Sequence, residues 1–249
     1  MVDGARTRDP KDHNLVLCQL SYDHRKQMFL TDLHRVSIVR FHGYYARQNI
    51  RKIGMARIIE YQTVLQRLTA QGLRCHYPNG GSFGFAPEAK TFVRGWIGPP
   101  DPSIRRSMQD VIRAVAVPYE RTLAELAARA WEHDLPGEAW LMPAAHWSFE
   151  LRHGNGDWLA ELIQSIGLDP ELLAQKTDAA AIEFSPPAAP LRQVLERLLQ
   201  RLLVSDFCIA FPRRGTVCTV HHHKQLWWVT TQRPVIDALD RLIGGDSSC

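Results

Sequence analysis

The chain of 249 residues contains few cysteines, and they follow no pattern that builds a disulfide framework or a zinc ribbon. The five cysteines are an odd number, they are widely spread, and no two form a Cys-X-X-Cys pair. Cys208 and Cys218 flank a predicted Pro-Arg-Arg-Gly turn and are the one pair placed to meet across a hairpin. Because we expect a reducing compartment, we interpret both as small core residues.

The chain also lacks a long hydrophobic run and an apolar segment near its N-terminus. Arginines interrupt every hydrophobic stretch, so none approaches the roughly 18 apolar residues that a membrane-spanning helix needs. Residues 1–11 are polar and mixed in charge, unlike a secretory signal. The hydrophobic fraction of 45% and the net charge of +4 exclude disorder as the dominant state. We therefore expect a globular cytoplasmic protein with no membrane partner.

Motifs of nucleotide binding and of covalent catalysis are missing as well. The glycine-rich segment 79–84 does not end in Gly-Lys-Ser/Thr, as a P-loop does, and it does not open a helix, as a dinucleotide fingerprint does. No Gly-X-Ser-X-Gly elbow occurs, and no cysteine has the context of a nucleophile. We interpret the glycine-rich segment as the turn of a small hairpin.

Charge is distributed unevenly along the chain, and this favours two lobes. Residues 1–135 carry 20 Lys and Arg against 13 Asp and Glu, whereas residues 136–249 carry 10 against 13. The net charge therefore changes from +7 to −3 near Pro136-Gly137. We predict a basic, mainly helical lobe over 1–135 and an α+β lobe over 136–249, with one continuous core as the alternative to two domains.

The first lobe is predicted to be helical with one hairpin. Apolar residues between Ile50 and Leu68 recur at three- and four-residue spacing, which indicates a helix that ends near Gln71. A second helix is predicted to begin at Asp101-Pro102, with apolar residues from Ile104 to Val115, and a third is predicted over 119–133. A hairpin near 73–85 is predicted because two short apolar segments flank the glycine-rich turn.

The second lobe alternates predicted strands with predicted helices. Strands are expected over 138–142, 145–152, 180–185, 207–211 and 217–230, and helices over 157–166, from 170, over 191–204 and over 234–243. Strand pairs separated by helices favour an antiparallel or mixed sheet covered on one face. The predicted fold class is α+β: a helical N-terminal lobe with a small β-hairpin, packed on a C-terminal antiparallel or mixed sheet with helices on one face.

The most unusual local pattern is a run of three histidines within the predicted strand 217–230. Side chains alternate along a strand, so His221 and His223 would share one face, with backbones roughly 6–7 Å apart. Neutral imidazoles at this spacing can bind one cation. The pattern therefore predicts two metal ligands, and a third ligand has to come from another strand.

The predicted strand 145–152 supplies the missing groups, because His146, Glu150 and Arg152 would lie on its polar face. We hypothesise that His146 completes a zinc or iron site and that Glu150 is a fourth ligand or the general base. Arg152 would orient an anionic substrate. The predicted function is a cytosolic enzyme with hydrolytic or oxidative chemistry on a small molecule. Without a metal, the same histidines could serve as an acid or base, or be ordinary residues of a sheet surface.

A basic stretch supports the alternative function, a non-enzymatic module that binds nucleic acid or an acidic partner. Eight basic residues and one acid lie between Arg35 and Arg74, and tyrosines interleave with the cations. Phosphates need cations and bases need rings for stacking, so the candidate nucleic-acid contacts are Arg40, Arg47, Arg51 and Lys52. The competing interpretation is a solvated helix face whose arginines pair with acids. A third possibility is an assembly subunit with the tryptophan-rich strand as its interface.

Overall fold

The computed structural model describes residues 56–76, 84–87, 91–98, 111–115, 119–203 and 205–245. These ranges belong to one compact unit that spans Ile50–Cys249. The four candidate nucleic-acid contacts between Arg40 and Lys52 lie outside the described residues, as do residues 101–110 of the helix predicted to begin at Asp101-Pro102.

An eight-stranded sheet forms the centre of this unit, in the order β1-β7-β6-β8-β9-β10-β4-β5. All neighbours are antiparallel except β4 and β5, so the sheet is mixed, as the sequence predicted. Strands from both sides of residue 135 pair within it. The strands are β1 Arg57–Glu60, β4 Phe92–Ile97, β5 Ile112–Ala114, β6 Ala139–Pro143, β7 Ala179–Phe184, β8 Phe207–Phe211, β9 Thr216–His221 and β10 Gln225–Thr230, and a separate hairpin joins β2 Leu73–His76 to β3 Gly84–Pro87.

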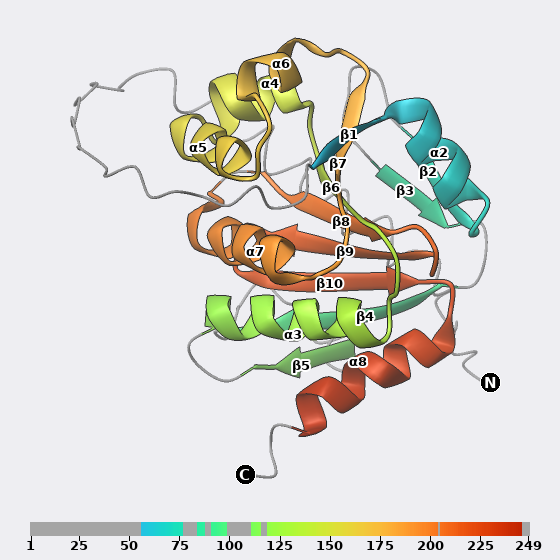
Figure 1. Ribbon diagram of the computed structural model, residues 1–249. Coiled ribbons are helices and arrows are strands. Elements are labelled where there is room, and N and C mark those ends of the chain that lie inside the picture. The colour runs from blue at the N-terminus through green and yellow to red at the C-terminus, as the bar shows by residue number, and fades with distance from the viewer. Residues whose placement is uncertain are drawn as a thin grey trace, which may run out of the picture. The chain divides into compact units, whose positions relative to one another are not determined.

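Helices lie on both faces of the sheet (Figure 1), and because all but one of its strand pairs are antiparallel, the fold class is α+β. They are α2 Tyr61–Thr69, α3 Tyr119–His133, α4 Trp147–Phe149, the π-helical turn η2 Glu150–Gly154, α5 Asp157–Ser165, α6 Pro170–Gln175, α7 Ala189–Arg201 and α8 Arg233–Gly245. Within the described part of the chain, no helix combines the length and apolarity needed to cross a membrane.

The larger core lies where α3, α7 and α8 cover one face of the sheet. Alternate strand residues point into it, so β8 contributes Phe207, Ile209 and Phe211. Trp96 and Trp228 meet edge to face in this core, with ring centroids 5.0 Å apart. The opposite face carries a smaller cluster beneath α2. The expectation of helices on one face was therefore incomplete, because α2 occupies the other.

Several elements follow directly from local sequence signals. Helix α3 has the predicted bounds, because its apolar residues recur at helical spacing along a face that is buried. Helix α6 begins where Asp169 accepts hydrogen bonds from two backbone N–H groups of the first turn, and Pro170 occupies a position that needs no donor. Gly167 follows α5 at φ +88°, the left-handed conformation of a helix end.

Two predictions for the first lobe were wrong. The spacing between Ile50 and Leu68 indicated one helix, but Arg57–Glu60 is strand β1 and the helix begins at Tyr61. Strand β1 is held by antiparallel pairing to β7, an interaction that local periodicity does not report. Ile112–Ala114 is also a strand rather than helix, because it pairs in parallel with β4.

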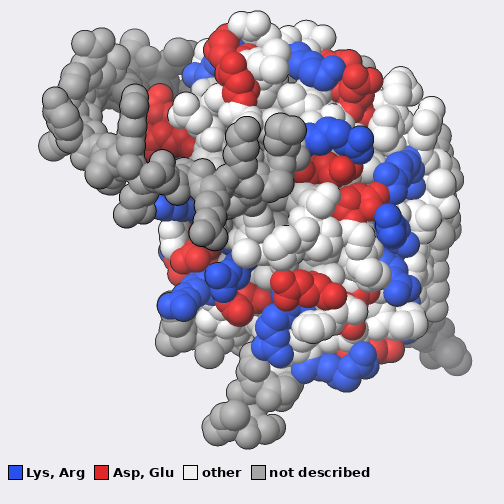
Figure 2. Space-filling model, in the orientation of Figure 1, with Lys and Arg blue, Asp and Glu red and all other residues white. Residues whose placement is uncertain are grey.

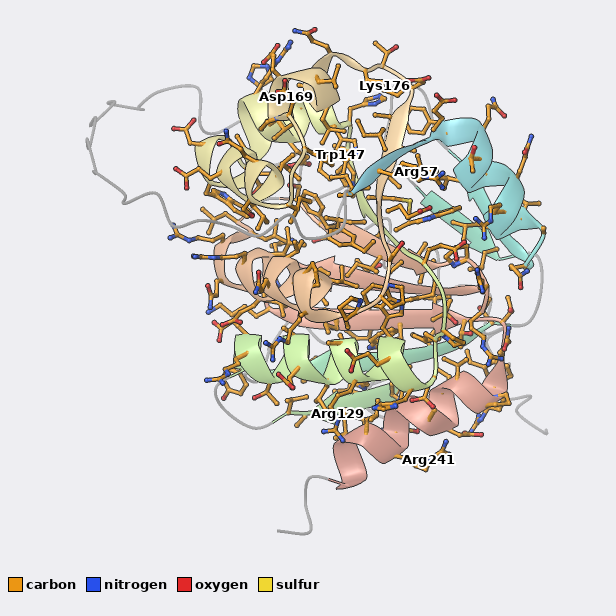
Figure 3. All side chains as sticks on the ribbon, viewed as in Figure 1. Arg57, Arg129, Trp147, Asp169, Lys176 and Arg241 are labelled. Carbon is orange, nitrogen blue, oxygen red and sulfur yellow. The ribbon has the colours of Figure 1, made fainter. Side chains whose placement is uncertain are left out.

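The predicted strand 145–152 is helical, as α4 followed by η2. The apparent alternation came from Trp147, Phe149 and Leu151. Of these three apolar residues, only Trp147 (labelled in Figure 3) is fully buried. Its indole N–H donates to the Ala180 carbonyl at 3.2 Å, and its ring meets the Phe207 ring edge to face. Glu150, assigned to the polar side, is completely buried.

The two hairpin cysteines do not face each other. Cys208 lies opposite Thr219, whereas Cys218 lies opposite Ile209, so the two side chains point to opposite faces of the sheet. Both are free thiols, and burial raises the pKa of Cys218 well above its usual value. They are core residues, and neither has the exposed thiolate character that reactivity requires.

The Glu138 carboxylate connects three elements on the sheet face that carries the smaller core cluster: α2, β6 and the turn between β8 and β9. Glu138, just before β6, accepts hydrogen bonds from Arg67 of α2 and from Nε of Arg213 at 3.0 Å in the β8–β9 turn. The Arg67 guanidinium also lies over the Trp140 ring, 4.9 Å from its centroid. Burial raises the pKa of Glu138, but a backbone hydrogen bond and the two guanidinium groups outweigh it and hold the pKa below its usual 4.5.

We predict that Glu138→Gln lowers the free energy of unfolding at neutral pH and that this loss disappears in acid. A lowered carboxyl pKa stabilises the fold above the unfolded-state value, and the contribution is lost as pH falls through the folded-state value. Urea denaturation between pH 7 and pH 3 measures this. The matched control is Glu161→Gln, an exposed position on α5. A pH-independent loss in Glu138→Gln would contradict the assignment.

Candidate metal centre: a histidine turn beside a buried aspartate

The predicted strand 217–230 is two strands joined by a tight connection, which we call the histidine turn, His221–Lys224. His221 ends β9 and pairs with Gln225, the first residue of β10. The backbone N–H of Lys224 donates to the His221 carbonyl at 3.0 Å, which closes the turn. The turn lies at the left-hand end of the strands in Figure 1, where β8 begins and β9 ends.

Lys224 has a backbone conformation that normally favours glycine, with φ +60°. A three-residue hairpin connection needs one left-handed residue, and here a lysine occupies that position. Its ammonium group donates to Glu120 Oε1 on α3 at 2.5 Å. That hydrogen bond lowers the pKa of Glu120, and the charge on Lys224 adds to the effect. An ion pair therefore anchors the turn to the start of α3.

The turn brings three imidazole rings to one place. One potential ligand atom from each of His221, His222 and His223 lies within 4.8 Å of the others. The ring centroids are 4.2 to 4.9 Å apart. His223 is exposed, whereas the side chains of His221 and His222 retain only 19% and 11% of their accessible surface. Within the described residues, this is the one group of three or more potential metal ligands.

A buried aspartate orients the turn. Asp206 precedes β8 and is 5% exposed. Its Oδ1 accepts the backbone N–H of His222 at 3.1 Å and lies 2.8 Å from His222 Nδ1, while Oδ2 lies 3.9 Å from His221 Nε2. Burial raises the pKa of Asp206, but the hydrogen bond from His222 and the charges of both rings lower it overall. The carboxylate is therefore ionised at neutral pH.

This contact fixes the proton of one ring. An ionised carboxylate only accepts hydrogen bonds, so His222 Nδ1 carries a hydrogen, and when the ring is neutral Nε2 is the nitrogen with a lone pair. In His221, Nδ1 accepts the backbone N–H of His223 at 3.2 Å, so in the neutral ring Nδ1 has the lone pair and Nε2 carries the hydrogen, 3.9 Å from Asp206 Oδ2. To bind a metal, His221 would either exchange this hydrogen bond for the ion at Nδ1 or change tautomer and coordinate through Nε2. A carboxylate behind a histidine is the usual outer partner of a metal-binding imidazole.

Glu150 lies near this site but is not one of its ligands. Its Oε2 accepts hydrogen bonds from Ser205 Oγ at 2.6 Å and from Asn155 Nδ2 at 2.7 Å. Gly154 leaves room for this carboxylate, because a Cβ there would collide with it. Ser205 is followed by Asp206, so Glu150 anchors the chain directly before the aspartate of the histidine turn.

The other residues of the predicted site have different partners. His146 Nδ1 lies 2.7 Å from the hydroxyl of Tyr61, and burial together with Asp178 raises the pKa of that hydroxyl. Arg152 pairs with Glu171 at 3.0 Å on an exposed surface. The structure thus brings His221 and His223 together, adds His222 and Asp206, and places His146, Glu150 and Arg152 against other groups.

Of the basic residues between Arg35 and Arg74, the structure describes the side chains of two, Arg57 and Arg67. Arg57 (labelled in Figure 3) pairs through Nη2 with Glu183 Oε2 at 3.0 Å. Arg67 pairs with Glu138. On the face shown in Figure 2, Lys and Arg side chains are interspersed with Asp and Glu. Both arginines therefore have the acidic partners that the competing interpretation expected.

We predict that Lys224→Gly is more stable than Lys224→Ala by about 1 kcal/mol, because a left-handed conformation costs a residue with a Cβ about 1–2 kcal/mol. Both variants lose the ion pair with Glu120, so their difference isolates the backbone. Chemical denaturation measures it. An alanine variant as stable as the glycine variant would show that position 224 is not strained.

We also predict that Asp206→Asn lowers the free energy of unfolding by roughly 1.5–3 kcal/mol, the range for a buried hydrogen bond to a charged group. The matched control is Asp237→Asn, which removes an exposed pair with Arg233 on α8 and should cost less than about 0.5 kcal/mol. If the two variants lose the same free energy of unfolding in urea denaturation, the buried hydrogen bonds of Asp206 contribute no more to stability than an exposed ion pair.

The comparisons with known proteins identify no relative from which a role for this centre could be transferred. No protein-family model matches the chain, no curated protein matches it, and no solved structure matches it. The function of the histidine turn is therefore inferred from its own residues and their geometry.

Proposed function

We propose that the histidine turn binds one divalent transition-metal ion of the zinc class through His221, His222 and His223. The observation that carries this proposal is the convergence of three imidazole nitrogens within 4.8 Å, with one of the rings oriented by a buried carboxylate. Three histidine ligands with an outer carboxylate are the donor set of many zinc sites in proteins.

The donor chemistry favours zinc over hard cations. Imidazole nitrogens suit zinc, copper, iron and nickel, whereas magnesium and calcium prefer oxygen ligands. Three nitrogens at zinc–nitrogen bond length in a tetrahedron are roughly 3.4 Å apart. The spread of up to 4.8 Å between the present ligand atoms would have to close by side-chain rotation when an ion binds.

The wider proposal is an enzyme that acts through this ion. Zinc would support hydrolysis of a small substrate, and iron would support oxidative chemistry. Relative to the set expected from the sequence, His222 replaces His146 as the third ligand, and Asp206 replaces Glu150 as the carboxylate of the centre. The contacts of His146 with Tyr61 and of Glu150 with Ser205 support this change.

Zinc titration of protein purified without a polyhistidine tag tests the ligand set. We expect one zinc per chain by calorimetry and elemental analysis, and at least a hundredfold weaker binding after joint replacement of His221, His222 and His223 by Gln. The matched control is His133→Gln with His153→Gln, two exposed histidines outside the turn. Undiminished binding in the triple variant would overturn the proposal.

Two further variants distinguish the three-histidine ligand set from the set expected from the sequence, which included His146 and Glu150. His146→Gln and Glu150→Gln should each keep one zinc per chain, because neither side chain belongs to the histidine group. Loss of zinc from folded His146→Gln protein would show that His146 is a ligand after all. Circular dichroism of each variant verifies that it is folded.

A further inference from the structure

We infer that a metal ion at the histidine turn has an open coordination position that takes a small anionic ligand. This inference rests on the proposed metal site and goes beyond it, because it names the chemical class of what binds there. Three observations support it: the number of protein ligands, the exposure of the turn and the charges around it.

The described residues supply three ligands and no fourth. The histidine group contains no cysteine and no carboxylate. Asp206 lies outside this group: its Oδ1 is bonded to His222 and its Oδ2 lies 3.9 Å from His221 Nε2, while Glu120 holds Lys224. Structural zinc sites are closed by four protein ligands, whereas sites with three ligands keep a position for water or substrate.

The open position faces solvent. The turn lies at the end of two strands, and His223 at its tip is exposed. The partly buried rings of His221 and His222 form the inner side of the centre against Asp206. A ligand that approaches from the side of His223 therefore reaches the ion without displacing core residues.

The charges favour an anion at that position. Imidazole ligands bind a metal in their neutral form and leave its two positive charges uncompensated, and the single carboxylate of Asp206, bonded to His222, offsets only one of them. The ammonium group of Lys224 is next to His223 in sequence, and Glu120 neutralises it. A net positive centre binds hydroxide, or the oxygen of a carboxylate or phosphate, more strongly than a neutral ligand of the same size.

Cobalt(II) replaces zinc as a visible probe in the experiment that tests this inference. We expect cobalt-loaded protein to show visible absorption bands that shift when azide is added, with saturation at one azide per cobalt. Acetate should also shift the bands, whereas acetamide, a neutral molecule of nearly the same shape, should not. Asp237→Asn, which alters a distant charge on α8, should respond like the unmodified protein.

The possible failures are distinguishable. Cobalt bands that do not change with azide or acetate would show a closed site, which overturns this inference and leaves the metal site standing. Equal responses to acetate and acetamide would overturn the preference for anions. Absence of cobalt binding, or binding that persists in the triple histidine variant, would overturn the proposed site and the open position with it.

Discussion

Burial of the Asp206 carboxylate is the constraint on which the histidine turn depends. A charged group removed from water costs several kcal/mol unless hydrogen bonds and opposite charge replace its hydration. Here one residue, His222, supplies both a backbone N–H and a ring N–H to the same oxygen. The chain has to turn immediately after His221 for this to happen, and the left-handed conformation of Lys224 completes that turn.

The same arrangement connects distant parts of the chain. Ser205 and Asp206 are adjacent, and they hold Glu150 of η2 and the histidine turn respectively. The Asp206 carbonyl also accepts the backbone N–H of Ala144 at 2.9 Å, which joins the end of β6 to the start of β8. The entrance to β8 is therefore fixed by side-chain and backbone contacts from three elements, and the orientation of the His222 ring is fixed with it.

Sequence periodicity predicted elements whose stability is local. The apolar residues of helix α3 recur at helical spacing, and helix α6 begins with an aspartate cap followed by proline. Both helices could therefore be predicted from the sequence. Sequence periodicity predicted the wrong conformation where pairing between strands decides the outcome, as in β1. The β9–β10 turn was missed for a different reason. Its left-handed residue is a lysine, so the usual glycine or asparagine signal is absent.

The histidine turn and its aspartate could be predicted only in part for the same reason. Strand alternation puts His222 on the opposite face from its neighbours, and the unrecognised turn is what brings it back. Asp206 carries no motif, and its importance follows from burial, which a single sequence does not report. The misread strand 145–152 in turn placed Glu150 and Arg152 on a shared face that does not exist.

Contiguity of the three histidines has a consequence for the energetics of the whole chain. Most metal sites gather ligands from distant segments, so only the folded protein binds the ion and the ion stabilises the fold strongly. Here a flexible unfolded chain presents the same three imidazoles within one short peptide. Any affinity of that peptide for the ion reduces the linkage between binding and folding. The ion would therefore raise the melting temperature less than its affinity suggests, and it could be acquired before the sheet is assembled.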